Sequence, residues 1–132
     1  MEDSIHKIWG ERKRILLNKE NEIDVLYLKK NTFCSTHNHE HKINKFYVIS
    51  GRIEIQTEFD KKILTKNEHF SVFPPLTHRF VAWEDSIVIE MAYVNKGKID
   101  INDIKRISQG GKIIAEREMT ENSLREKGLL NL

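Results

Sequence analysis

The chain has 132 residues, of which 39% are hydrophobic and 32% charged, and this length favours one soluble domain with a single core. Its 22 Lys and Arg residues nearly balance its 20 Asp and Glu residues, so the charge gives no support for nucleic-acid binding. No apolar run approaches the roughly 20 residues that span a bilayer, the first residues do not resemble a signal peptide, and the single cysteine, Cys34, excludes an internal disulfide. We therefore expect a cytoplasmic protein that does not interact with membranes.

Short β-strands account for most of the predicted elements. Residues 22–30 alternate in polarity, residues 44–50 are β-branched and aromatic, and Gly51 separates them from residues 52–59, where apolar and polar side chains alternate cleanly. Further strands are predicted in the segments 61–65, 69–73, 78–83 and 86–94, with turn-like residues between them. About eight strands without a helical pattern between them predict an antiparallel sandwich or barrel.

The C-terminal part of the chain has a different pattern. Residues 95–114 are interrupted by glycines and are predicted to form loops. Residues 119–132 predict one short helix, with Ser123 and Glu126 at the spacing of a capping box and Gly128 as the stop. We therefore expect a single domain over residues 1–132, with a barrel core at about 22–94 and an extension at 95–132.

Three of the six histidines occur at every second position, as His37, His39 and His41. Side chains alternate between the two faces of a strand, so these three would share one face with Ser35, while Cys34 would lie on the other. Cys34 is then best interpreted as a small buried hydrophobic residue. Two imidazoles spaced in this way point into one volume and are typical ligands for zinc, iron, nickel or copper. Such a site needs further ligands from other strands.

These residues resemble the first motif of the cupins, a glycine, five residues, His-x-His, a short gap, Glu, six residues and Gly. His37 and His39 match the His-x-His pair, and Gly51 matches the closing glycine. Asn44 stands where the family has the glutamate, and Asn31, which tolerates left-handed backbone angles, stands at the opening glycine. The resemblance implies an all-β cupin fold, which is a double-stranded β-helix or jelly-roll-like barrel, here with a short C-terminal helix.

The second cupin motif, a proline-rich turn followed by a histidine, is matched by Pro74, Pro75 and His78. By this resemblance, His37, His39 and His78 are the expected ligands of a divalent metal ion, with Asn44 as a fourth contact. The ion could be zinc, manganese, nickel or iron. The alternative is that the histidines bind an organic ligand through hydrogen bonds alone.

A narrower resemblance connects the chain to the cupin domains of type II mannose-6-phosphate isomerases. It is carried by Trp9-Gly10, by the run "STHNHEHK", by Ile89-Glu90 and by "NDIKR" at 102–106. It implies a sugar or sugar phosphate as the ligand and an isomerase as one possible activity. By the same resemblance to small cupins, we expect a homodimer.

Two residues are candidates for the catalytic base of an isomerase. Glu90 lies within an apolar strand, which is costly unless the carboxylate is paired, and it could face either the barrel interior or the solvent. His41 would lie at the rim of the same strand as the ligand pair. Two other functions remain open, a non-catalytic small-molecule-binding cupin and an oxygenase with a three-histidine iron site. The basic cluster Arg12, Lys13 and Arg14 is predicted to be a solvated face.

Overall fold

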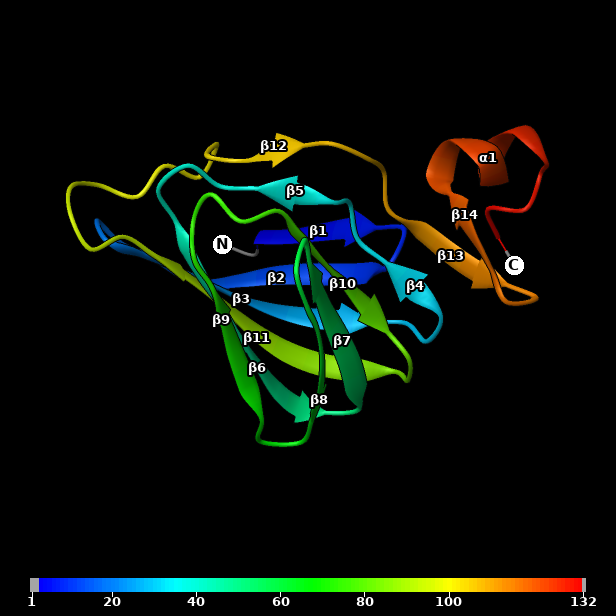
Figure 1. Cartoon of the computed structure of the whole chain (residues 1–132), viewed down its shortest axis with the longest axis horizontal. Coiled ribbons are helices and arrows are strands. Elements are labelled where there is room, and N and C mark those ends of the chain that lie inside the picture. Colours follow the sequence, from blue (N-terminus) through cyan, green and yellow to red (C-terminus); the bar gives the residue numbers. More distant parts are fainter. Residues whose placement is uncertain (1–2, 132) are drawn as a thin grey trace.

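The computed structural model describes residues 3–131, which form two antiparallel sheets that face each other as a barrel (Figure 1). The first sheet has the order β1 (Asp3–Lys7), β2 (Gly10–Leu17), β3 (Asn21–Leu28), β11 (Ser86–Tyr93), β6 (Ile43–Ser50) and β9 (His69–Val72). The second has the order β12 (Lys105–Arg106), β5 (His37–Asn38), β10 (His78–Ala82), β4 (Thr32–Phe33), β13 (Gly111–Ile114) and β14 (Arg117–Thr120). In addition, β7 (Arg52–Thr57) pairs with β10, and β8 (Lys61–Thr65) pairs with β7. The predicted all-β fold is confirmed.

One end of the barrel is filled by an apolar core. The alternation predicted for residues 22–30 and 52–59 turns every second side chain inward, and these side chains are almost fully buried as far as Leu28 and Ile55, whereas Phe59 lies beyond the end of β7 and is exposed. The core combines residues from both sheets, including Leu26, Leu28, Phe46, Val48, Ile53, Ile55, Phe80 and Val88. This packing fixes the two sheets against each other and closes one end of the barrel.

The inward faces of three strands become polar at the other end of the barrel. On β3 the inward series continues from Leu26 to the buried Asp24 and Glu22. On β6 it continues to the buried Asn44, and on β11 to Glu90. Buried polar groups are costly without partners, so the change of polarity along these strands marks a functional interior.

Two tight turns agree with the expectations from the sequence. Gly51 connects β6 to β7 at a φ of +92°, and a Cβ there would lie 2.2 Å from Oγ of Ser86, so only glycine fits. Asn31 precedes β4 with a φ of +63°, the left-handed conformation that asparagine tolerates.

The sheet extends further toward the N-terminus than the predicted core at 22–94. Strands β1 and β2 form a hairpin that pairs with β3, on the edge of the first sheet. The sequence of β2 shows no alternation of apolar and polar residues. Arg12 and Arg14 line the polar interior, and Lys13, on the opposite face, is also charged. Apolar alternation is therefore lost on a strand whose two faces are both polar.

The C-terminal helix exists, but its predicted start is wrong. Helix α1 (Glu121–Glu126) begins after Thr120, whose hydroxyl accepts a hydrogen bond from the backbone N–H of Ser123 at 3.3 Å. Ser123 therefore lies inside the helix, and its hydroxyl is not the cap. Gly128 follows with a φ of +69°, as expected for a helix stop. No helix within residues 3–131 is long and apolar enough to cross a membrane.

Candidate metal centre

Three histidines converge inside the polar half of the barrel. His37 on β5 lies directly opposite His78 on β10 in the strand pairing, and His39 follows one residue after β5 ends. Their ring centroids are separated by 4.6 Å (His37 to His78), 5.1 Å (His37 to His39) and 5.3 Å (His39 to His78). One nitrogen from each ring lies within 4.8 Å of the other two, which is the arrangement of a potential metal site.

Backbone carbonyls fix the orientation of all three rings. The Nδ1 atoms donate to carbonyl oxygens of Ser35 (from His37, 2.7 Å), Asp103 (from His39, 2.6 Å) and Leu76 (from His78, 3.0 Å). A carbonyl oxygen only accepts hydrogen bonds, so each Nδ1 carries the proton and each Nε2 keeps its lone pair. Metal-binding histidines are commonly held in this tautomer by such partners.

Burial keeps the three rings neutral. Loss of solvent lowers the pKa of His37 to about 3, and the neighbouring His78 and His39 act in the same direction. It lowers the pKa of His78 to about 4 and also lowers that of His39. The rings are therefore unprotonated at neutral pH, which is the state that a metal ion requires.

Asn44 on β6 connects His39 to Glu90. Its Nδ2 atom donates to Nε2 of His39 at 3.1 Å and to Oε2 of Glu90 at 3.0 Å. Within residues 3–131, its Oδ1 atom and Nε2 of His78 are both buried without a hydrogen-bond partner. Two buried lone pairs without a donor in one polar interior are unusual, and they fit the ligand atoms of a cation site. A half-turn of the Asn44 amide exchanges its nitrogen for its oxygen, so this residue fits the role of fourth ligand.

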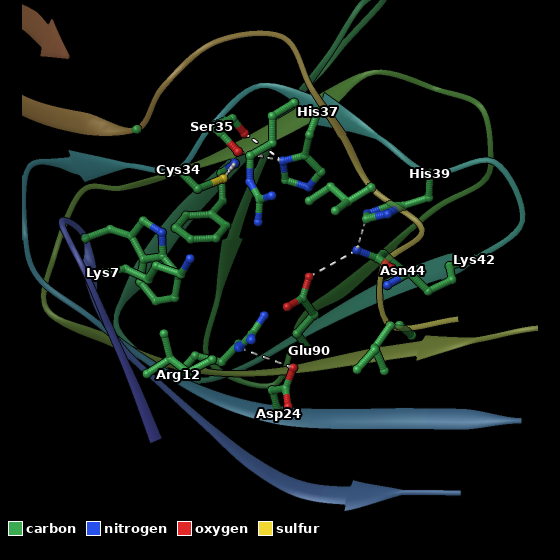
Figure 2. A pocket seen from close by; sticks show the side chains of 18 of the residues that line it. Lys7, Arg12, Asp24, Cys34, Ser35, His37, His39, Lys42, Asn44 and Glu90 are labelled. Atoms are coloured by element: carbon green, nitrogen blue, oxygen red, sulfur yellow. Dashed lines mark hydrogen bonds and ion pairs between the residues drawn. The ribbon is translucent and has the colours of Figure 1, made fainter. Parts of the chain in front are cut away.

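Glu90 faces the interior, which settles the orientation that the sequence left open. It lies on β11 directly opposite Asp24 on β3, and its side chain points toward Asn44 (Figure 2). Burial raises the pKa of Glu90 to about 7, and the negative charges of Asp24 and Glu22 add to this effect. A carboxyl group that titrates near neutral pH can both accept and return a proton.

A network of ion pairs links side chains of the first sheet in the wall of the cavity. Arg14 contacts Glu22 at 2.6 Å and Asp24 at 3.1 Å, and Lys42 contacts Glu22 at 3.2 Å. The prediction of a solvated basic face at residues 12–14 is therefore wrong for Arg14, whose side chain is only 17% exposed. Alternate residues of a strand point to opposite faces, which sends Arg14 inward.

A cavity of about 770 Å³ opens beside these groups and is lined by His37, His39, Asn44 and Glu90 (Figure 2). This volume accommodates a small polar molecule. His41 does not line the cavity, although the sequence made it a candidate base. The strand ends at Asn38, so the period of two is lost before His41 is reached, and its side chain is exposed.

Cys34 is buried as predicted, but it does not lie on the face away from the histidines. It lines the same cavity, because the chain is not in a strand at residues 34–36. Its sulfur accepts a hydrogen bond from the backbone N–H of Phe80 at 3.2 Å. Burial raises the pKa of the thiol to about 12, so it is not a nucleophile at neutral pH.

Comparisons with solved structures identify the same fold. KdgF from Halomonas sp. has a TM-score of 0.65 at 23% identity, over 71% of this chain and 87% of that one. An RmlC-like cupin from Shewanella frigidimarina has a TM-score of 0.62 at 23% identity, over 72% and 86%. The nucleoside dehydratase Pac13 from Streptomyces has a TM-score of 0.69 at 7% identity, over 82% of this chain and 86% of that one. Identities this low show a shared fold and not a shared substrate.

A search of curated proteins found no match to this chain. Residues 1–109 match the family described as "Mannose-6-phosphate isomerase C-terminal". This match covers both histidine motifs and the strands around the cavity, and it agrees with the cupin fold of the structural neighbours. The chain therefore belongs to the mannose-6-phosphate isomerase C-terminal family and has a cupin fold.

Proposed function

We propose that this protein is a metal-dependent enzyme that moves a proton between neighbouring carbons of a sugar or sugar phosphate, as in aldose–ketose isomerisation. The observation that carries the proposal is the position of Glu90. Its carboxyl group has a pKa of about 7 and faces the same cavity as His37 and His39, which cluster with the buried His78 and, like it, have an Nε2 atom free of protons. A potential Lewis-acid site beside a proton carrier is the combination expected of a catalytic site for proton transfer.

His37, His39 and His78 would hold the ion, with Oδ1 of Asn44 as a fourth contact. A divalent ion at this position would polarise the carbonyl oxygen of the sugar and stabilise the negative charge that develops there. This donor set suits zinc, manganese, nickel or iron. The surrounding strands bury the ligands and limit access of water from the core side.

Glu90 would act as the base. In its ionised form it accepts the proton from the carbon next to the carbonyl, and in its neutral form it returns the proton to the adjacent carbon. Before the half-turn that would present Oδ1 to an ion, Nδ2 of Asn44 donates to the Glu90 carboxylate at 3.0 Å and directs it into the cavity. The like charge of Asp24 across the strand pair keeps Glu90 basic enough for the first step.

The proposal is tested by incubating the protein, loaded separately with zinc, manganese, nickel and iron, with mannose 6-phosphate in deuterated water. We expect deuterium at C1 of the fructose 6-phosphate formed with at least one metal, and a rate at least about a hundredfold lower in Glu90→Gln at unchanged metal content. Glu20→Gln, an exposed carboxylate away from the cavity, is the matched control. The isomerase proposal fails if no metal supports exchange, or if Glu90→Gln is as fast as the wild type.

A second function, a non-catalytic binding module, is favoured by one observation. Nδ2 of Asn44 donates to Nε2 of His39, which uses the lone pair that a metal ion would need. In this arrangement the histidines would bind an organic ligand by hydrogen bonds alone. Anaerobic metal analysis of the purified protein separates the two: stoichiometric metal supports the enzyme, and none supports the module. Bound iron with oxygen uptake would instead support the three-histidine oxygenase.

A further inference from the structure

Five cationic side chains line the cavity: Lys7, Arg12, Arg14, Lys42 and Arg106. They fall into two groups. Arg14 and Lys42 lie deep in the cavity and are neutralised by the ion pairs described above. The other three belong to the rim. This division separates cations that hold the wall together from cations that remain available to a ligand.

The rim cations have little or no neutralisation within the protein. The side chains of Lys7 and Arg106 form no hydrogen bond or ion pair with any residue in the range 3–131. Arg12 has one such contact, with Asp24, and it is long at 3.9 Å. Their side chains are also accessible, since Lys7 and Arg106 are exposed and the Arg12 side chain is 29% exposed.

These three residues come from opposite ends of the chain. Lys7 ends β1 and Arg12 lies on β2, whereas Arg106 lies on β12, which runs along β5. In that pairing Arg106 stands directly opposite His37, so it is tied in register to the candidate metal centre. Figure 2 shows Lys7 and Arg12 on the side of the cavity away from His39 and Lys42. The rim therefore places positive charge across the cavity from part of the histidine site.

The positive charges at the rim act on one another. The pKa of Lys7 is lowered, first by partial burial and then by the charges of Arg106 and Arg12. Glu121 acts in the opposite direction, but its effect is the smallest of the four. Like charges that are gathered with only partial compensation cost free energy, and an anion bound between them would reduce that cost.

We propose that Lys7, Arg12 and Arg106 form a subsite at the cavity mouth for an anionic oxygen group, a phosphate or a carboxylate, on the molecule that binds beside the histidines. The proposal rests on the proposed function, because it assumes that the polyhydroxy part of the ligand occupies the cavity. The planar guanidinium groups of Arg12 and Arg106 can each donate two parallel hydrogen bonds to such an anion. Lys7 adds a point charge with three donors.

The subsite is tested by calorimetric titration of three probes at constant ionic strength: inorganic phosphate, glucuronate and glucose. Metal-free protein in EDTA is used so that an anion cannot bind to a metal ion. The variants are Arg106→Gln and Lys7→Gln, and Lys105→Gln is the matched control. Lys105 is the neighbouring cation on the same short strand, and it does not line the cavity.

We expect one or both anions to bind at least about tenfold more tightly than glucose, and Arg106→Gln and Lys7→Gln each to weaken anion binding about tenfold or more. Lys105→Gln should bind like the wild type. Tighter binding of phosphate identifies a phosphate subsite, and tighter binding of glucuronate a carboxylate subsite. The inference is overturned if neither anion binds better than glucose, or if Lys105→Gln weakens binding as much as Arg106→Gln. Metal content and deuterium exchange are measured separately, so failure of the subsite is distinguished from failure of the enzyme proposal.

Discussion

His39 donates its Nδ1 proton to the backbone carbonyl of Asp103, 64 residues further along the chain, at 2.6 Å. The carboxylate of the same aspartate accepts the backbone N–H groups of Glu40 (2.7 Å), His41 (2.8 Å) and Lys42 (3.1 Å). These hydrogen bonds lower the pKa of Asp103 despite its partial burial. Asp103 therefore holds both the ring of His39 and the loop that follows it. One residue of the C-terminal extension positions a candidate metal ligand.

Asp103→Ala should weaken metal binding about tenfold or more, since partners that orient metal ligands commonly contribute 10–100-fold. Three backbone N–H groups lose their acceptor, and the loop that carries His39 loosens. Competition titration with a chelating dye measures the affinity. Asp100→Ala is the control, because among residues 3–131 that carboxylate accepts a single backbone N–H, from Asn102. Equal affinity of Asp103→Ala and the wild type would show that the carbonyl contact alone orients His39.

Acid should destabilise the metal-free protein through its histidines. The pKa values of His37 and His78 fall from 6.5 to about 3 and about 4 on folding, so the unfolded chain binds more protons below pH 6.5. Stability from these groups is complete above about pH 6.5 and is lost as the pH falls toward the folded values. Urea unfolding in EDTA at pH 7.5 and pH 5 measures the change. His37→Gln should reduce the loss, whereas the exposed His69→Gln should not. Equal losses in these two variants would contradict the assignment.

Glu90 should make the metal-free protein more stable, not less, as the pH falls from 7.5 to 5. Its pKa rises from 4.5 to about 7 on folding, so the folded state binds the extra proton. This contribution is complete below about pH 4.5 and is lost as the pH rises through 7. Metal-free Glu90→Gln should therefore lose more stability than the wild type between pH 7.5 and pH 5. The same urea experiment tests it, and a smaller loss in Glu90→Gln would show that the carboxyl group is not buried as described.

Asn44→Glu should bind metal at least about tenfold more tightly than the wild type, because a carboxylate oxygen would replace a neutral amide oxygen beside a dication. The same change should destabilise the metal-free protein, since the new carboxylate would face Glu90 in place of an amide donor at 3.0 Å. Competition titration and urea unfolding in EDTA measure the two effects. Asn44→Ala, which has no ligand atom, is the control. Unchanged or weaker affinity in Asn44→Glu would show that position 44 does not face the ion.

The barrel and the histidine cluster could be predicted because their signals are local. Strict alternation in residues 52–59 places Ile53 and Ile55 in the core. The cupin resemblance likewise anticipated that His37, His39 and His78 meet, and the structure brings them together. The sequence could not decide which way Glu90 points, because flanking residues on both faces of its strand are apolar.

The rest of the site depends on contacts between distant segments. Asp103 and Arg106 belong to a stretch with no regular period, and their roles appear only when residues 101–110 lie along the cavity. The strand alternation of side chains ends at Asn38, because the carboxylate of Asp103 accepts hydrogen bonds from the backbone that follows. His41 is therefore directed to the solvent. Side-chain alternation describes a strand but cannot show where another segment interrupts it.

The central claim is that His37, His39 and His78 bind one divalent ion. The most direct test is the metal content of the purified protein by mass spectrometry, compared with that of the double variant His37→Ala, His39→Ala, with folding of both checked by circular dichroism. We expect about one ion per wild-type chain and none above background in the folded double variant. A folded double variant that keeps one ion per chain, or a wild type that holds none after incubation with zinc, manganese, nickel or iron, would contradict the claim.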